Sequence, residues 1–120
     1  MQNFLAVYLG SGDAGSPAAA RWSAMDDVER EKERRRGVEA WHRWMETHRA
    51  SIVDAGGPLG RTKRISADGV SEAGNRLTGY VVVRAGSHEA AAKMFENHPH
   101  FAILPGHAVE IMPCLPIPGA

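Results

Sequence analysis

Apolar positions follow one another almost without interruption in residues 3–9, and again in residues 78–85, which are rich in Val. A strand that is apolar on both sides is usually covered on both faces of its sheet. Apolar and polar residues alternate in residues 107–114, while residues 59–67 alternate around several basic side chains. We therefore predict four strands, of which residues 59–67 form an exposed or edge strand that ends at an Asp68-Gly69 turn.

A long amphipathic helix is predicted between the first two strands. Its apolar and aromatic positions recur at spacings of three and four, on one helix face: Val38, Trp41, Met45, His48 and Ile52. Gly56-Gly57-Pro58 should end the helix near residue 55. Glycine adopts the left-handed conformation found at helix ends, and proline cannot continue a helix.

The chain before this helix is polar. Residues 10–20 are rich in Gly, Ser and Ala, which predicts a flexible loop. Residues 25–36 are strongly charged and helix-prone, and their basic residues gather toward the end, as the helix dipole favours. We interpret this run as a solvated helical face, with anion binding by Arg34-Arg35-Arg36 as the alternative. Gly37 is expected to mark a kink or break.

A second helix should begin at Ser87, whose hydroxyl can cap the first turn. Its apolar face consists of Ala90, Ala91, Met94 and Phe95. Residues 97–100, Asn-His-Pro-His, are expected to end it. Residues 70–76 are interpreted as a polar loop, and the prolines within residues 113–120 predict an extended tail.

The predicted order of elements is β-α-β-β-α-β, the order of a ferredoxin-like α+β fold. It predicts an antiparallel four-stranded sheet with two helices on one face. Two helices cannot cover both faces, so we expect the open face to pack against a second copy in a homodimer. Residues 1–120 are expected to form one domain, with residues 10–37 as a loop and charged helical insertion.

Charge and composition exclude some function classes. The chain has 14 basic and 14 acidic residues, without the basic excess typical of nucleic-acid binders. No apolar run approaches the roughly 20 residues that span a bilayer, so no membrane partner is expected. Cys114 is the single cysteine, so no disulfide can form within the chain. A cytoplasmic location is the simplest inference.

Several blocks of sequence occur together in a recognisable order: Gly57-Pro58 after the long helix, Asp68-Gly69, a Gly-Tyr-Val-Val-Val strand and a final Val-Glu-Ile-Met-Pro strand. This pattern resembles the YCII-related family of the dimeric α/β-barrel superfamily, over residues 41–116 and the first strand. Some YciI-like members have been proposed to use a His–Asp dyad. At the corresponding positions this chain has Ala40 and His98, so an activity that depends on the dyad is not implied.

Histidines are the main candidates for chemistry. His48 lies on the apolar helix face and could be a general base, since histidine titrates near neutrality, or a hydrogen-bonded core residue. His98 and His100 frame Pro99 at the end of the second helix. They could contact a small molecule, form a polar helix stop, or join His107 in a metal site. We predict His48 and His98 as candidate catalytic residues, and no metal.

Aromatic residues and one carboxylate complete the predicted site. Ligand-binding residues are expected to be Tyr8, Trp41, Trp44, Tyr80, His100 and Glu110. The alternative for the two tryptophans is a core or interface role. Glu110 lies between apolar neighbours, so it should be half-buried and paired with a cation, with proton transfer as the alternative.

The function predicted from the sequence is small-molecule binding or weak catalysis in a pocket between the long helix and the sheet. Catalysis there would be acid–base chemistry without a redox cofactor. The alternative is a non-catalytic dimeric binding or assembly module in which the histidines are structural. The sequence does not specify the ligand.

Overall fold

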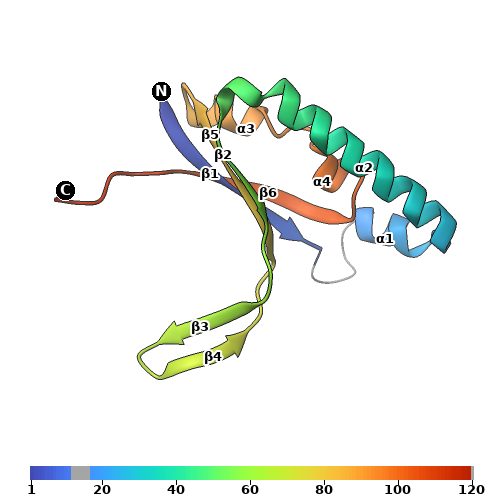
Figure 1. Ribbon diagram of the computed structural model, residues 1–120, viewed down its shortest axis with the longest axis horizontal. Coiled ribbons are helices and arrows are strands. Elements are labelled where there is room, and N and C mark those ends of the chain that lie inside the picture. Colours follow the sequence, from blue (N-terminus) through green and yellow to red (C-terminus); the bar gives the residue numbers. More distant parts are fainter. Residues whose placement is uncertain (12–16, 120) are drawn as a thin grey trace.

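The computed structural model describes residues 1–11 and 17–119. It is an α+β fold in which the helices lie on one side of a sheet (Figure 1). The elements follow in the order β1 (Gln2–Gly10), α1 (Pro17–Ser23), α2 (Asp27–Thr47), a short 3-10 turn (Arg49–Ser51), β2 (Ile52–Pro58), β3 (Thr62–Ser66), β4 (Gly69–Ala73), β5 (Leu77–Ala85), α3 (His88–Lys93), α4 (Pro99–Ala102) and β6 (Gly106–Pro113). The predicted loop at residues 10–20 lies partly outside the described residues, and its end belongs to α1.

Four strands form one antiparallel sheet in the order β2-β5-β1-β6. The two strands predicted to be apolar on both sides, β1 and β5, are its central pair. The arrangement is compatible with the ferredoxin-like plan expected from the sequence. No helix in the described part of the chain is long and apolar enough to cross a membrane.

The core lies between the sheet and the helices. Phe4, Ala6 and Tyr8 alternate along β1 and point to the helix-covered face, since successive strand residues point to opposite faces. Trp44 and Phe95 pack against them from the helical layer. Phe4 is 1% exposed, and burying a side chain of this kind contributes about 1.5–3 kcal/mol.

The helix α2 continues through Gly37 without interruption, so the predicted break does not occur. An added Cβ at Gly37 would lie 2.4 Å from the Leu104 side chain. The glycine therefore provides room for the chain before β6 to pack against α2. The helix begins with a capping box, in which Asp26 accepts the Glu29 N–H and the Glu29 side chain accepts the Asp26 N–H.

The helix α2 ends at Thr47, not near residue 55 as the glycine signal predicted. Residues Ile52–Pro58 form the edge strand β2, which pairs with β5. Gly56 has a φ of 62° and would place a Cβ 1.9 Å from the Tyr80 carbonyl oxygen. The glycine is thus needed for an irregularity within a strand. The prediction that Gly56 belongs to a helix end is wrong.

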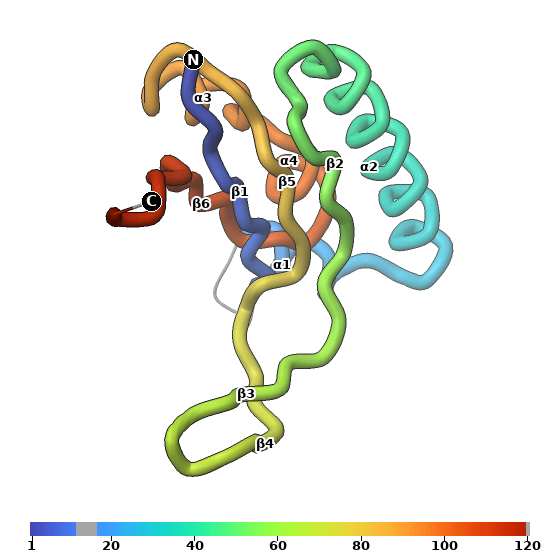
Figure 2. The backbone as a smooth tube through the Cα atoms, turned by 60° about the vertical axis from the view of Figure 1, so that its left-hand side comes forward, coloured from blue at the N-terminus to red at the C-terminus, as the bar shows by residue number. Residues whose placement is uncertain are grey.

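Strands β3 and β4 form a separate hairpin that projects from the main sheet (Figures 1 and 2). The predicted Asp68-Gly69 turn is confirmed, because β3 ends at Ser66 and β4 begins at Gly69. The predicted polar loop at residues 70–76 is wrong, because most of it belongs to β4. The exposed strand expected within residues 59–67 is confirmed as β3, but it pairs with β4 rather than with the main sheet, whose edge is β2.

Candidate functional site

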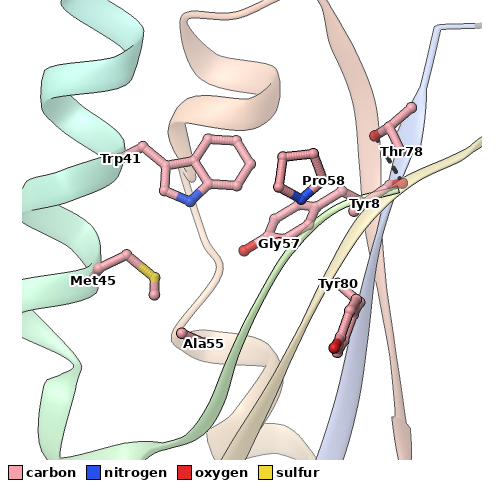
Figure 3. Close-up of a pocket in the computed structure, with 9 residues that line it drawn as sticks. Tyr8, Trp41, Met45, Ala55, Gly57, Pro58, Thr78 and Tyr80 are labelled. Carbon is pink, nitrogen blue, oxygen red and sulfur yellow. Dashed lines mark hydrogen bonds between the residues drawn. The ribbon is translucent and has the colours of Figure 1, made fainter. Parts of the chain in front are cut away.

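A cavity of about 260 Å³ lies between α2 and the end of the sheet formed by β2, β5 and β1 (Figure 3). Aromatic and small side chains dominate its wall, and none of the described residues that line it carries a formal charge. The lining residues are Tyr8, Trp41, Met45, Ala55, Gly57, Pro58, Thr78, Gly79 and Tyr80.

Gly79 helps to leave this space open. It is the register partner of Tyr8, so both residues lie on the helix-covered face. An added Cβ would be 3.2 Å from the Gly57 carbonyl oxygen and 3.4 Å from the Tyr8 ring. Beside it, the Thr78 hydroxyl donates to the Tyr8 carbonyl oxygen at 3.1 Å and holds the two strands together at the cavity.

Tyr8 projects from β1 toward α2 and is 3% exposed. Its ring lies 4.7 Å from the Trp41 ring, centroid to centroid. The Tyr8 hydroxyl oxygen is 3.3 Å from Nε2 of His98. Burial raises the pKa of the Tyr8 phenol, so the group stays protonated at every physiological pH.

His98 is fully buried behind the cavity wall, at 0% exposure. Its ring contacts Trp41 at 4.6 Å and Trp44 at 4.7 Å between ring centroids. Nδ1 of His98 accepts the backbone N–H of His100 at 3.0 Å. Burial, with smaller contributions from His100 and His48, lowers the pKa of His98 to about 3. The ring is therefore neutral at neutral pH, with its proton assigned to Nε2 by this hydrogen bond.

His100 is held in the same cluster. Its Nε2 lies 2.7 Å from the Leu9 carbonyl oxygen, which can only accept, so this nitrogen carries the proton. Gly106 fits against the ring, since an added Cβ would approach it to 2.4 Å. Burial lowers the pKa of His100, and the hydrogen bond to Leu9 opposes this shift.

The structure brings part of the predicted site together. Tyr8, Trp41 and Tyr80 line the cavity, and His98, His100 and Trp44 lie in or beside the buried cluster behind it. Tyr80 is the register partner of Val7, so its side chain belongs to the opposite face of the sheet from Tyr8.

His48 and Glu110 lie elsewhere. His48 is the C-cap of α2 and packs on Trp44, with 4.7 Å between the ring centroids. Burial lowers the pKa of His48. Glu110 pairs in register with Val7, on the sheet face away from the cavity. It is exposed rather than half-buried, and no ion pair of the described residues includes it.

Sequence reasoning missed Met45 as a lining residue, although its place on the apolar helix face was visible. It also missed Gly79, because its place opposite Tyr8 can be known only from the pairing of β1 with β5. No group of three or more metal-ligating side chains occurs among the residues that the structure describes. His98 and His100 share a cluster, while His107 is exposed at the start of β6.

The fold and this cavity define a small α+β protein with an aromatic-walled space beside an antiparallel sheet. No family model and no curated protein matches the sequence. Among solved structures, the chain is similar to 5-chloro-2-hydroxyhydroquinone dehydrochlorinase from Burkholderia phenoliruptrix, in complex with 2,5-dihydroxybenzoquinone. The TM-score is 0.51, the identity is 16%, and the match covers 92% of this chain and 90% of that one. The likeness shows the fold.

Proposed function

We propose that the protein binds a small, uncharged, mainly apolar molecule in the cavity between α2 and the sheet. The observation that carries this proposal is the uncharged wall of aromatic and small residues around about 260 Å³ of space. Transferring a charged ligand there would remove its hydration without supplying an opposite charge. An uncharged ligand avoids that penalty and gains from the burial of apolar surface.

The size and shape of the cavity support a one- or two-ring molecule. Its volume lies just below the range of about 300–1,000 Å³ that holds drug-sized ligands. Tyr8 and Trp41 offer aromatic surfaces, and Met45 supplies a flexible thioether that adapts to a ring edge. The structural neighbour was solved with a single-ring molecule, which agrees with this ring number.

Binding is better supported than proton transfer. Nδ1 of His98 already accepts a backbone N–H, and a pKa near 3 makes the ring a weak base. Acid–base chemistry by His48 or His98, without a redox cofactor, remains a prediction. At His98 it would require a substrate that reaches a ring now enclosed by Tyr8, Trp41 and Trp44.

Acetophenone, an uncharged single-ring ketone, is a suitable probe. We expect it to perturb the NMR signals of the Met45 methyl group and of Trp41 in a saturable titration. Trp41→Ala removes one wall and should weaken binding at least several-fold. His42→Ala, on the next and exposed helix position, is the matched control and should bind as the wild type does. Unchanged Met45 and Trp41 signals at saturating probe would contradict the proposal.

The open face of the sheet supports a second proposal, self-association. Strand alternation and register place aliphatic side chains there, opposite the helix-covered face. These are Leu5, Val7, Leu9, Val82 and Met112. An apolar patch of this kind, which shares its face with Glu110 and Tyr80, is typical of a surface that meets a second copy. A dimeric mass in sedimentation at micromolar concentration would support this assembly, and a monomer would contradict it.

A further inference from the structure

Two hydrogen bonds in series connect the backbone to the cavity wall. The His100 N–H donates to Nδ1 of His98 at 3.0 Å, and Nε2 of His98 lies 3.3 Å from the Tyr8 hydroxyl oxygen. A neutral imidazole has one N–H, and the first bond leaves it on Nε2. The second bond therefore runs from His98 Nε2–H to the Tyr8 oxygen, which acts as the acceptor.

This polarity determines what the Tyr8 hydroxyl can offer. Because its oxygen accepts from His98, its own proton must point elsewhere. Among the described residues, no acceptor for that proton is found within hydrogen-bonding distance. Figure 3 shows the hydroxyl group directed toward α2, between Trp41 and Met45, on the side where the cavity lies. The Tyr8 O–H is thus a donor without a protein acceptor.

Trp41 adds a second donor at the same end of the cavity. Its ring stacks at a tilt on Tyr8, 4.7 Å away between centroids. In the part of the chain that the structure covers, the Trp41 Nε1–H forms no hydrogen bond, whereas the Trp44 Nε1–H donates to the Met94 carbonyl oxygen at 2.8 Å. One O–H donor and one N–H donor therefore lie at the same end of the cavity.

We propose that Tyr8 is the hydrogen-bond donor that selects the ligand, with His98 as the positioning residue that fixes its direction. The ligand class is an uncharged aryl carbonyl compound, whose oxygen accepts from Tyr8 while its ring lies against Trp41. This inference rests on the proposed binding function and adds the chemistry of the ligand. A carbonyl oxygen fits because it accepts without donating, and it needs no counter-charge.

A matched pair of probes tests the donor. Acetophenone and 2-phenylpropene share a shape, but the second has a CH₂ group in place of the carbonyl oxygen. Wild-type protein should bind acetophenone about 3- to 10-fold more tightly, the effect of one neutral hydrogen bond. In Tyr8→Phe this preference should fall to about one, with 2-phenylpropene affinity little changed. The infrared carbonyl stretch of bound acetophenone should shift to lower frequency in the wild type only.

The outcomes separate the two proposals. Equal binding of both probes to the wild type, with no carbonyl shift, overturns the donor assignment and leaves the cavity as an apolar binding site. Failure of both probes to bind overturns both proposals. Even if Tyr8→Phe does not fold, a carbonyl shift that persists in Trp41→Phe assigns the donor to Tyr8, and its loss in that variant would assign it to Trp41 instead.

The role of His98 has its own readout. In ¹⁵N spectra of histidine-labelled protein, Nε2 of His98 should show the shift of a protonated nitrogen and Nδ1 that of an unprotonated one. The opposite assignment would reverse the bond to Tyr8 and contradict the positioning role. His98→Phe should abolish the preference for acetophenone, while His98→Gln, which retains a side-chain N–H donor, should restore part of it. A merely structural role would weaken both probes equally.

Discussion

The two faces of one sheet differ sharply, although the same strands build both. On the helix-covered face, Tyr8 and Phe4 are buried in a cluster of rings with hydrogen-bonded polar atoms. On the opposite face, Leu5 and Met112 are only partly covered, and Met112 is 39% exposed. Adjacent residues thus have different roles, because strand alternation sends them to opposite sides. In the function proposed above, the first face would carry ligand specificity and the second would join two copies.

The largest contrast should appear between neighbours on β1. Phe4→Ala empties a fully buried site, and we expect a loss of about 3–5 kcal/mol in the free energy of unfolding. Leu5→Ala, one position along, should cost at most about 1–2 kcal/mol in the isolated chain, because Leu5 is already partly exposed. Urea denaturation of both variants at low protein concentration measures the difference. Equal losses would show that the two faces are equally buried.

Acid should destabilise the histidine-containing face. Burial lowers the pKa of His98 to about 3, from the ordinary histidine value of 6.5. Between these values the unfolded chain binds more protons than the folded one, so stability rises with pH. The contribution is fully present above about pH 6.5 and is lost as pH falls toward 3. The low pKa of His100 acts in the same direction.

At about 1.4 kcal/mol per pH unit for one such group, stability should fall by about 2–3 kcal/mol between pH 6.5 and 4.5. Chemical denaturation across this range, with His98→Gln as the non-titrating comparison, measures the slope. A variant slope as steep as that of the wild type would assign the acid sensitivity to other groups.

A charge on the open face should affect association more than folding. Val82→Asp places a carboxylate among Leu5 and its aliphatic neighbours. If that face joins two copies, burial of the charge should abolish the dimer. The isolated chain should lose at most about 1 kcal/mol, because the new charge remains in water. Sedimentation measures the first effect and thermal unfolding the second. A persistent dimer would place the interface elsewhere.

The smallest effect is expected on the projecting hairpin. Lys63 and Glu72 form an ion pair across β3 and β4, and each side chain is 65% exposed. Exposed pairs of this kind contribute about 0–1 kcal/mol. Glu72→Gln should therefore change stability by less than about 1 kcal/mol and leave acetophenone affinity unchanged. A larger loss would mean that the hairpin packs against another surface.

The centre of the sheet could be predicted from the sequence, because continuous apolar runs identify β1 and β5. The start of α3 could also be predicted, because Ser87 caps it as expected. The edge strand β2 was missed. Ile52 continues the helical spacing from Trp41, and Gly56-Gly57-Pro58 imitates a helix stop. In the structure α2 ends at Thr47, and Gly56 instead serves an irregular strand pairing that only the position of Tyr80 explains.

The sequence could predict those parts of the candidate site that depend on the type of a single residue and on the element that carries it. Tyr8 and Trp41 were visible as aromatic residues on apolar elements. The space between them was not, because it depends on Gly79 being the register partner of Tyr8. The sequence also could not predict which of Tyr8 and His98 donates the hydrogen bond between them. That direction depends on the backbone N–H of His100, which donates to Nδ1 of His98.

The most direct test of the uncharged cavity compares acetophenone with benzoate at pH 7. The two probes are similar in size, but the second carries a full negative charge. We predict that acetophenone binds at least about 10-fold more tightly, because no cation among the lining residues compensates the desolvation of a carboxylate. Calorimetric titration of the wild-type protein measures both affinities. Benzoate binding as tightly as acetophenone, with perturbation of the Met45 and Trp41 signals, would contradict the account.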